Sequence, residues 1–368
     1  NRPILAKDVL VKPQSLHPFA VDNFTGGQLP RSFSSDHCLA ARALVFPDKQ
    51  ILPFVNSSIP LSKDSLEGIS LVDLIRFFES PSKYFLVNCL GMSLWEDDPP
   101  PQDHEPMSLN NLEKYGVKNR LLAMALTPEP EINFHALEKA KGSLPPGSLG
   151  EVWFNEAAIE VDQFMERWGD ALVGEYAPPA LLEGIISGLK IRGEVVSVLN
   201  GKQVLYRCGA TRPKDRLSAW IKHLFTCAFL PLDSLETRFF AMDKAKKYLS
   251  FEPIPEDQSK ELLSKLIEVF QKGMLRPIPF FPASSHAYAK ELLNGESPVT
   301  DELKDGAVKK ARQEWEPSSF SRGGPKEGES AENLTCFRDD PIGHPAFAHL
   351  AQEVFGPLLD HQREESEL

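Results

Sequence analysis

The sequence is poor in cysteine, and the cysteines it has form no metal or disulfide pattern. They are Cys38, Cys89, Cys208, Cys227 and Cys336, an odd number, widely scattered and without a C-x-x-C pair. Disulfide scaffolds and zinc knuckles need paired or closely spaced thiols. We therefore expect reduced cysteines, as in cytoplasmic proteins, and no bound metal.

Long apolar runs and an excess of basic residues are also missing. The longest apolar runs, such as residues 224–232, fall well short of the roughly 20 residues that a membrane helix needs. The net charge is −12, from 40 Lys and Arg against 52 Asp and Glu. This argues against a uniformly basic surface that coats nucleic acid. It leaves a local basic groove open, because phosphate contacts depend on where the cations lie. No Gly-x-x-x-x-Gly-Lys-Ser/Thr loop occurs, so we expect no ATP site.

The remaining composition is typical of a folded protein with more than one packed unit, or with large additions to one domain. Its 368 residues exceed the usual size of one core, while 42% hydrophobic and 25% charged residues lie close to globular averages. Proline is abundant, at 31 residues, which indicates many rigid turns. The chain begins Asn1-Arg2, without a Met or an apolar leader, so we expect a fragment of something longer.

Composition and periodicity divide the chain into five parts. We expect an extended strap or the end of a preceding domain over 1–62, a helical layer over 63–143, a core over 144–293, a flexible loop over 294–335 and a terminal helix over 336–368. The first part is punctuated by Pro and lacks helical periodicity. The acidic, Pro-rich stretch 96–101 should be a surface loop.

Helices are indicated where apolar residues recur every three or four positions. We expect them from Leu71, from Pro81 with Ser80 as N-cap, over 110–125, 134–141, 150–172 and 217–225, over 262–270 with Gly273 as C-cap, and over 344–359, after which the last charged residues should fray. Strand-like runs are expected at 185–191, 194–199, 204–208 and 237–242, with Asn200-Gly201 as a hairpin turn.

The order of elements between Gly147 and Met242 is a helix, three antiparallel strands, a helix and a strand, and it resembles the core of the PD-(D/E)xK nucleases. The resemblance implies a divalent cation in active members. They hold it with an acid or His on the first helix, an Asp on the second strand, and an acid and a Lys on the third. Oxygen ligands must hold Mg²⁺ near the scissile phosphate for this chemistry to work.

This sequence keeps at most one of those groups. After a Gly-Ser-Leu-Gly segment similar to that of RecB-type nucleases, Glu151 stands at their first ligand position. In Gly-Glu-Val-Val, which resembles their Gly-x-Ile-Asp, Val196 replaces the Asp. In Leu-Tyr-Arg-Cys, Tyr206 and Cys208 replace the two groups of their Asp-x-Lys. One carboxylate cannot hold a catalytic Mg²⁺ tightly, so we predict that these four positions are degenerate and that no residue is catalytic.

A similar loss marks residues 70–85. They resemble the Ser…Tyr-x-x-Cys-Pro-x-x-Phe segment of nucleases whose Cys ligates an iron–sulfur cluster. Ser80 occupies the position of that Cys, and the other thiols lack cluster spacing. We therefore predict no cluster.

Several ordered blocks resemble the carboxy-terminal part of the RecC family, the gamma subunits of exodeoxyribonuclease V. They are Leu74–Ala125, Leu144–Phe154, Trp220–Ala228 and Leu262–Pro282, within a resemblance that covers roughly residues 13–368. It implies a catalytically silent, nuclease-like domain of the RecBCD helicase–nuclease, without a cofactor of its own. In that family the domain lies near the point where duplex DNA is split and helps to hold the motor subunits.

Five basic residues cluster between the third strand and the following helix: Arg207, Arg212, Lys214, Arg216 and Lys222. Two interpretations stay open, contacts to DNA phosphates and an ordinary solvated face.

Other conspicuous side chains favour structural roles. Trp153, Trp168 and Trp220 have amphipathic spacing and are expected in the core. His223 is expected at the surface or at the edge of the core. Glu151 is expected to interact with the dipole of the helix that it opens.

We therefore expect an α/β (α+β) fragment: a degenerate PD-(D/E)xK nuclease-like core with a central mixed sheet flanked by helices, and an extended amino-terminal strap. The expected function is a non-catalytic scaffold and DNA-handling domain, in the cytoplasm and without membrane contact. Its expected partners are RecB, RecD, and a double-stranded DNA end with its separated strands. Two alternatives stay open, an active Mg²⁺-dependent nuclease and a protein-interaction module without DNA contact.

Overall fold

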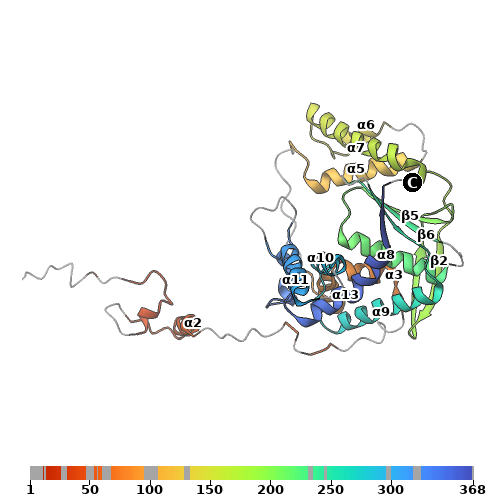
Figure 1. The fold of residues 1–368 in the computed structure, drawn as a ribbon. Helices are drawn as coiled ribbons and strands as arrows, with labels where there is room; N and C mark the ends of the chain where they lie inside the picture. Colours follow the sequence, from red (N-terminus) through yellow and green to blue (C-terminus); the bar gives the residue numbers. More distant parts are fainter. Residues whose placement is uncertain are drawn as a thin grey trace, which may run out of the picture. The chain divides into compact units, whose positions relative to one another are not determined.

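The computed structural model describes residues 11, 14–25, 31–46, 54–55, 57–59, 68–94, 107–127, 133–230, 235–243, 247–295, 300–317 and 325–366. The chain divides into two units, Asn1–Pro53 and Phe54–Leu368, which are described separately (Figure 1). The stretch 96–101, for which a surface loop was expected, lies outside the described residues.

The first unit contains a helix where only extended chain was expected. A short 3-10 turn, η1 (Val21–Asn23), precedes α2 (Ser35–Val45), whose first turn is capped by the Ser34 hydroxyl accepting from the His37 N–H. The prediction of extended structure is therefore wrong over α2. Ala41 is the one buried residue of α2, so no periodic apolar face marks this helix in the sequence.

The second unit holds the remaining elements. Its helices are α3 (Leu71–Glu79), α4 (Pro81–Tyr84), the π-helical turn η3 (Phe85–Cys89), α5 (Asn111–Leu126), α6 (Phe134–Ala140), α7 (Ser148–Leu172), α8 (Pro213–Phe229), α9 (Glu256–Leu275), α10 (Pro282–Asn294), α11 (Asp301–Trp315), the 3-10 turn η4 (Glu327–Glu329), α12 (Ala331–Cys336) and α13 (Pro345–His361). Its strands are β1 (Ile69–Ser70), β2 (Ala180–Ile186), β3 (Leu189–Val195), β4 (Val198–Leu199), β5 (Lys202–Arg207), β6 (Glu236–Ala241), β7 (Tyr248–Phe251) and β8 (Gln362–Glu365).

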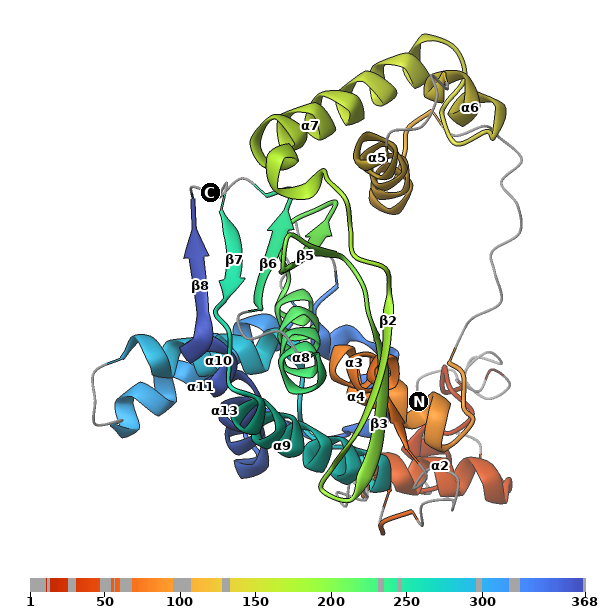
Figure 2. The ribbon, with the colours of Figure 1, turned by 90° about the vertical axis from the view of Figure 1, so that its right-hand side faces the viewer.

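The strands form two mixed sheets. In the three-stranded sheet, of order β1-β3-β2, β1 runs parallel to β3 and β2 antiparallel. In the five-stranded sheet, of order β4-β5-β6-β7-β8, only β5 and β6 are parallel, and α8 connects them. Figure 2 shows β5 to β8 side by side, with α7 across their ends. The expectation of a mixed α/β fold is confirmed.

Strand β6 shows how helices cover both faces of the five-stranded sheet. Phe239 and Ala241 belong to the large core that contains the apolar face of α8. Phe240, between them in the strand, belongs to a second core with Trp168 of α7, at 5.2 Å between ring centroids. This alternation follows from the period of two in a strand, and it fixes α7 and α8 on opposite sides of the sheet.

One expected strand is broken by a turn. Residues 185–191 were expected to be continuous, but Ser187 and Gly188 adopt positive φ, 49° and 79°, and join β2 to β3 as a hairpin. The predicted turn at Asn200-Gly201 is confirmed, with φ of 50° and 75° between β4 and β5. The two hairpins belong to different sheets, so the expected set of three consecutive, mutually paired antiparallel strands is wrong.

Gly273 lies inside α9 rather than at its C-cap. The helix continues to Leu275, with Arg276 as the C-cap. A Cβ on Gly273 would lie 2.3 Å from Cζ of Phe77, so the glycine allows α3 to approach α9 closely. Its role is packing, which the sequence pattern alone did not distinguish from capping.

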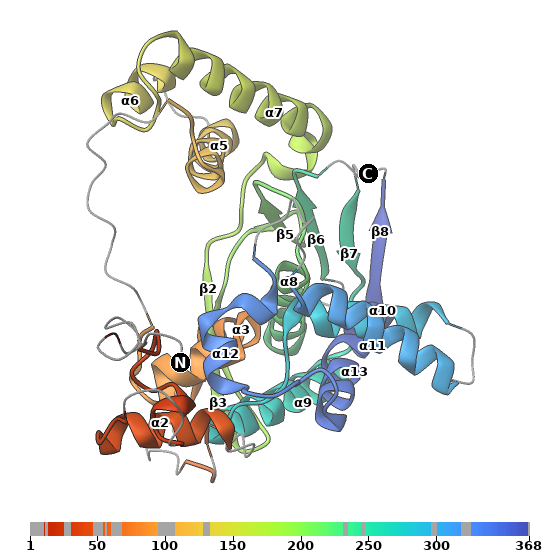
Figure 3. The same ribbon diagram turned by 90° about the vertical axis from the view of Figure 1, so that its left-hand side faces the viewer.

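The carboxy-terminal region is more ordered than predicted. The flexible loop expected over 294–335 instead contains α11, η4 and α12 among the described residues, and Figure 3 shows α10, α11 and α13 gathered together. Only the small residues Ala307 and Ala311 of α11 are buried, which explains why its charged sequence gave no helical signal. The last residues, expected to fray, form β8 and pair with β7.

Candidate nucleic-acid interface

A cleft of about 400 Å³ opens between β5, the β3–β4 link and α8, and we name it the β5–α8 cleft. Its lining includes two of the predicted degenerate positions, Val196 and Tyr206, and two of the predicted DNA-contact residues, Arg207 and Lys222. The structure therefore brings part of both predicted sets into one place.

Helix α8 supplies one wall of the cleft. Asp215, Ser218, Ala219 and Lys222 are spaced by three or four residues, so they lie on one face of the helix. The helix begins with Pro213 at its first position, and the Asp215 carboxylate accepts a hydrogen bond of 2.9 Å from the Arg212 N–H. These are ordinary signals of a helix start, and they fix the register of the wall.

Strand β5 supplies the opposite wall and a buried cation. The Arg207 guanidinium donates to Asp215 at 2.8 Å and lies over the ring of Tyr115, 5.6 Å from its centroid. Its side chain is 16% exposed, and its Nε is buried without a hydrogen-bond acceptor in the described part of the chain. Asp215 thus neutralises Arg207 and caps α8 at the same time.

Lys222 is the second cation of the cleft and lacks such a partner. It is half-buried on α8, and burial lowers the pKa of its ammonium, an effect that the Glu79 carboxylate opposes. No carboxylate of the described residues forms an ion pair or hydrogen bond with it. Glu79 is itself exposed at the end of α3. The cleft therefore contains one cation whose charge is poorly compensated.

The other two degenerate positions do not line the cleft. Cys208 is 1% exposed, its thiol points to Met242 Sδ at 3.7 Å, and burial raises its pKa to about 11. Glu151 is exposed in the first turn of α7. The structure thus brings together Val196 and Tyr206, and separates them from Glu151 and Cys208.

The donor set of the cleft is unsuited to holding a metal ion. Its carboxylates are Glu79 and Asp215, and Asp215 is committed to Arg207 and to the start of α8. Among the residues that the structure describes, no group of three or more His, Cys, Asp or Glu is placed to hold a metal.

The other predicted contact residues lie apart from the cleft. Arg212 and Lys214 line a neighbouring hollow of about 650 Å³, whose other charged residues are Lys326, Glu79, Glu314 and Glu327. Arg216 instead donates to Glu364 at 2.9 Å and is 16% exposed, so its charge is used within the fold. Arg212 and Lys214 are hereafter called the basic turn.

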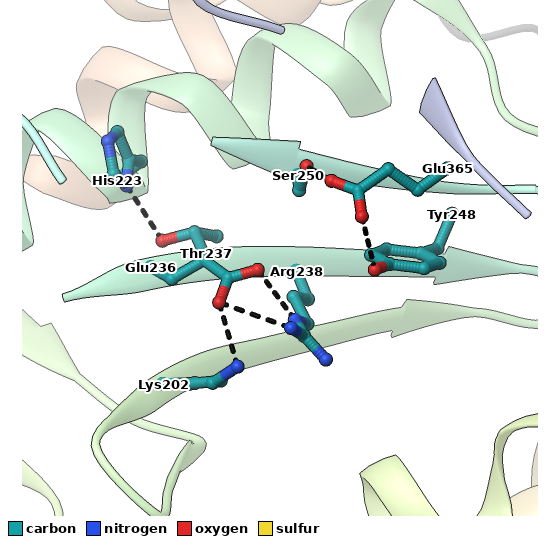
Figure 4. Close-up of polar contacts among 8 residues, drawn as sticks. All are labelled: Lys202, His223, Glu236, Thr237, Arg238, Tyr248, Ser250 and Glu365. Atoms are coloured by element: carbon teal, nitrogen blue, oxygen red, sulfur yellow. Dashed lines mark hydrogen bonds and ion pairs between the residues drawn. The ribbon is translucent and has the colours of Figure 1, made fainter. Parts of the chain in front are cut away.

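A polar network braces the sheet beside the cleft (Figure 4). His223 of α8 lies 2.9 Å from the Thr237 hydroxyl, which donates to Gln203 of β5 at 3.2 Å. His223 is fully buried, and burial lowers its pKa to about 4. The expectation of a surface or core-edge His223 was therefore wrong.

The same figure shows charged groups along the strands. Glu236 of β6 pairs with Lys202 at 2.8 Å and with Arg238 at 2.6 Å, and Glu365 of β8 accepts from Tyr248 at 2.7 Å. The Lys202–Glu236 pair joins β5 to β6, and the Tyr248–Glu365 hydrogen bond joins β7 to β8.

The three tryptophans that were expected in the core differ in how deeply they are buried. Trp168 and Trp220 are 3% and 1% exposed, as expected for core residues. Trp153 is half-buried, and the Lys114 ammonium lies over its ring, 3.6 Å from the centroid. None of the three lines the β5–α8 cleft.

The sequence did not indicate five polar residues of the cleft: Glu79, Tyr115, Ser197, Asp215 and Ser218. Asp215 carried a signal, because an acid three residues after a helix start commonly caps it. Glu79 and Tyr115 come from helices far away in the sequence, and no local pattern indicates that they meet β5.

In the described part of the chain, no helix has both the length and the apolar character to cross a bilayer.

Comparison with known proteins gives one family. The model of the RecC C-terminal domain matches residues 66–293, more than half of the chain. Similar proteins named RecBCD enzyme subunit RecC occur in Escherichia coli K12, with 25% identity over 72% of this chain and 23% of the relative, and in Mycolicibacterium smegmatis, with 27% over 80% and 27%. The relative from Mycobacterium tuberculosis H37Rv is 24% identical over 88% and 29%. The chain spans about a quarter of the length of these relatives.

Proposed function

The chain belongs to the RecC C-terminal domain family, and from that premise we propose that it is the non-catalytic scaffold and DNA-handling domain of a RecC subunit. The similar proteins are named RecBCD enzyme subunit RecC. In this proposal the domain anchors RecB and RecD in the cytoplasm during repair of double-strand breaks by recombination. It guides the separated strands of a DNA end and leaves cleavage to other subunits.

The order of elements supports descent from a PD-(D/E)xK nuclease. Helix α7 precedes the strands β2 to β5, and α8 then connects β5 to a parallel β6. This agrees with the helix–strands–helix–strand order on which the resemblance was based, although the strands divide between two sheets.

The groups in the cleft support a loss of catalysis. Val196 and Tyr206 stand where ligands would be expected, and the Asp215 carboxylate is already paired with Arg207. A catalytic Mg²⁺ needs several oxygen ligands, and a single exposed Glu79 does not supply them. A nicking assay of the chain with Mg²⁺ and with Mn²⁺ tests this point, and metal-dependent cleavage would favour an active nuclease instead.

The proposal of DNA handling rests on one observation, the basic turn beside the β5–α8 cleft. Arg212 and Lys214 lie at the start of α8, whose next turns line the cleft. The hollow that they line also contains Lys326, which pairs with Glu314 at 3.1 Å, and the carboxylates of Glu79 and Glu327. Two neighbouring cations at one turn make phosphate contacts possible in a chain whose net charge is −12.

The test is salt-dependent binding of forked DNA. We expect the full chain to bind a fork, and reversal of Arg212 and Lys214 to Glu to abolish binding and its dependence on salt. A matched control reverses Lys309 and Lys310 of α11, which are exposed and change the net charge equally. Equal loss in both double variants would reduce the effect to net charge. Undiminished binding after the first reversal would contradict DNA handling by this surface and favour a pure protein-interaction module.

A further inference from the structure

The β5–α8 cleft contains an ammonium group that forms no ion pair with the described residues, although the exposed Glu79 carboxylate also lines the cleft and opposes the lowering of its pKa. Lys222 lines the cleft from α8, and no carboxylate of the described residues pairs with it. Asp215, on the same helix face, is taken by Arg207 at 2.8 Å. A half-buried cation without a partner is unfavourable by itself and gains most from an anion that enters the cleft.

Hydroxyl groups and aromatic rings also line the cleft. Ser218 lies one turn before Lys222 on the same helix face, and Ser197 lies on the β3–β4 link. Tyr206 lines the cleft from β5 and is 40% exposed, and the ring of Tyr115 lies behind Arg207. A cation with hydroxyl donors suits a phosphate group, and an exposed tyrosine ring suits the face of a nucleobase.

The size of the cleft limits what can enter. Its volume of about 400 Å³ lies near the lower end of ordinary small-molecule sites. It suits one unpaired nucleotide and is too small for the two strands of a duplex. Val196 and Ala219 contribute apolar wall, and they offer no ligand to a cation.

We propose that the β5–α8 cleft binds one nucleotide of an unpaired DNA strand, with a phosphate at the Lys222 ammonium and the base against the Tyr206 ring. The inference rests on the proposed DNA-handling function and names the substrate class and the residues that take it. No bond is made or broken in this proposal. If the domain descends from a nuclease, the cleft now binds a strand and does not cleave it.

The experiment uses thymidine 3′,5′-bisphosphate as a minimal probe of one nucleotide with both flanking phosphates. Binding to the full chain is followed by saturation-transfer NMR and calorimetry. Lys222→Met should weaken binding by about tenfold or more, whereas Lys222→Arg keeps the charge and should retain most of it. Tyr206→Leu should weaken the probe but leave inorganic phosphate unchanged, while Tyr206→Phe should bind like the original chain.

The matched control is Lys265→Met, because Lys265 is an exposed lysine of α9 paired with Glu261 at 2.8 Å. This variant should bind the probe unchanged. Absence of binding to the original chain would overturn the inference, as would equal binding by Lys222→Met. Inorganic phosphate that binds as tightly as the bisphosphate would also overturn it, since the site would then recognise a free phosphate and no nucleotide.

The two binding experiments distinguish failure of the cleft inference from failure of the proposed function. If forked DNA binds through the basic turn and the bisphosphate does not bind, the cleft inference is wrong while DNA handling stands. If the bisphosphate binds and the fork does not, the cleft is a nucleotide site and the proposed handling of a DNA end is wrong.

Discussion

The guanidinium of Arg207, on β5, lies 2.8 Å from the carboxylate of Asp215, on α8, and both side chains are largely buried. Asp215 also accepts from the Arg212 N–H at the start of the helix. One carboxylate therefore joins a strand to a helix and sets the position of the cleft wall between them.

Removal of this carboxylate should destabilise the protein measurably. Asp215→Ala loses a helix cap and leaves the Arg207 guanidinium with less compensation, so we expect the free energy of unfolding to fall by about 2–3 kcal/mol. Asp215→Asn keeps an oxygen that can cap the helix, so its free energy of unfolding should lie between those of Asp215→Ala and the original chain. Urea denaturation measures the effect. Asp301→Ala, at an exposed pair of α11, is the control and should leave the midpoint almost unchanged. Equal midpoints for Asp215→Ala and the original chain would show that the contact contributes nothing.

Two helical glycines should respond in opposite directions to alanine. At Gly273 a Cβ would lie 2.3 Å from Phe77, a fully buried ring, so Gly273→Ala should cost about 1–3 kcal/mol despite the better helix propensity. At Gly306 in α11 nothing lies within 4 Å, so Gly306→Ala should stabilise by about 0.5–1 kcal/mol. Thermal unfolding of the two variants gives the comparison. A gain at Gly273 would mean that α3 and α9 are packed less closely than the structure has them.

Gly273 also illustrates what sequence could predict. The long helices α3, α7, α8, α9 and α13 have wide apolar faces, so their positions followed from periodicity alone. Helices α2 and α11 bury one and two small residues respectively, and that pattern carries no apolar period. A glycine near the end of a helix is predicted to be a C-cap. Its packing role becomes visible only when the facing ring, here Phe77, is known.

The cleft was predictable only in part, for a related reason. Val196 and Tyr206 were found because a motif specifies their spacing, and both line the cleft. Cys208 lies two residues beyond Tyr206, yet it is buried beside Met242. Glu79 and Tyr115 reach the cleft through tertiary packing of α3 and α5. A single sequence contains no local record of such long-range contacts.

The buried His223 should make stability depend on pH. Its pKa is about 4 in the folded protein against an ordinary value of 6.5, because burial disfavours the charged ring. Between these values the unfolded chain binds more protons, so stability falls as the pH decreases from 6.5 toward 4, with a slope of up to about 1.4 kcal/mol per pH unit from this group.

Comparison with His223→Gln isolates that contribution. Between pH 6.5 and pH 5 the original chain should lose about 1.5 kcal/mol more than the variant, measured by urea denaturation at each pH. His349→Gln is the control, because His349 is 74% exposed on α13. Parallel pH profiles for His223→Gln and the original chain would show that His223 does not titrate between the folded and unfolded states in this range.

The unpaired ammonium of Lys222 should lower the stability of the unliganded protein. Lys222→Met keeps the length of the side chain on α8 and removes a charge whose pKa burial lowers, so the unliganded variant should be more stable. We expect a gain of about 1 kcal/mol, or about 2–4 °C in the thermal midpoint, together with the loss of nucleotide binding. Lys265→Met should show neither change. A lower midpoint for Lys222→Met would mean that the ammonium stabilises the unliganded fold, and the physical reason for an anion in the cleft would then be gone.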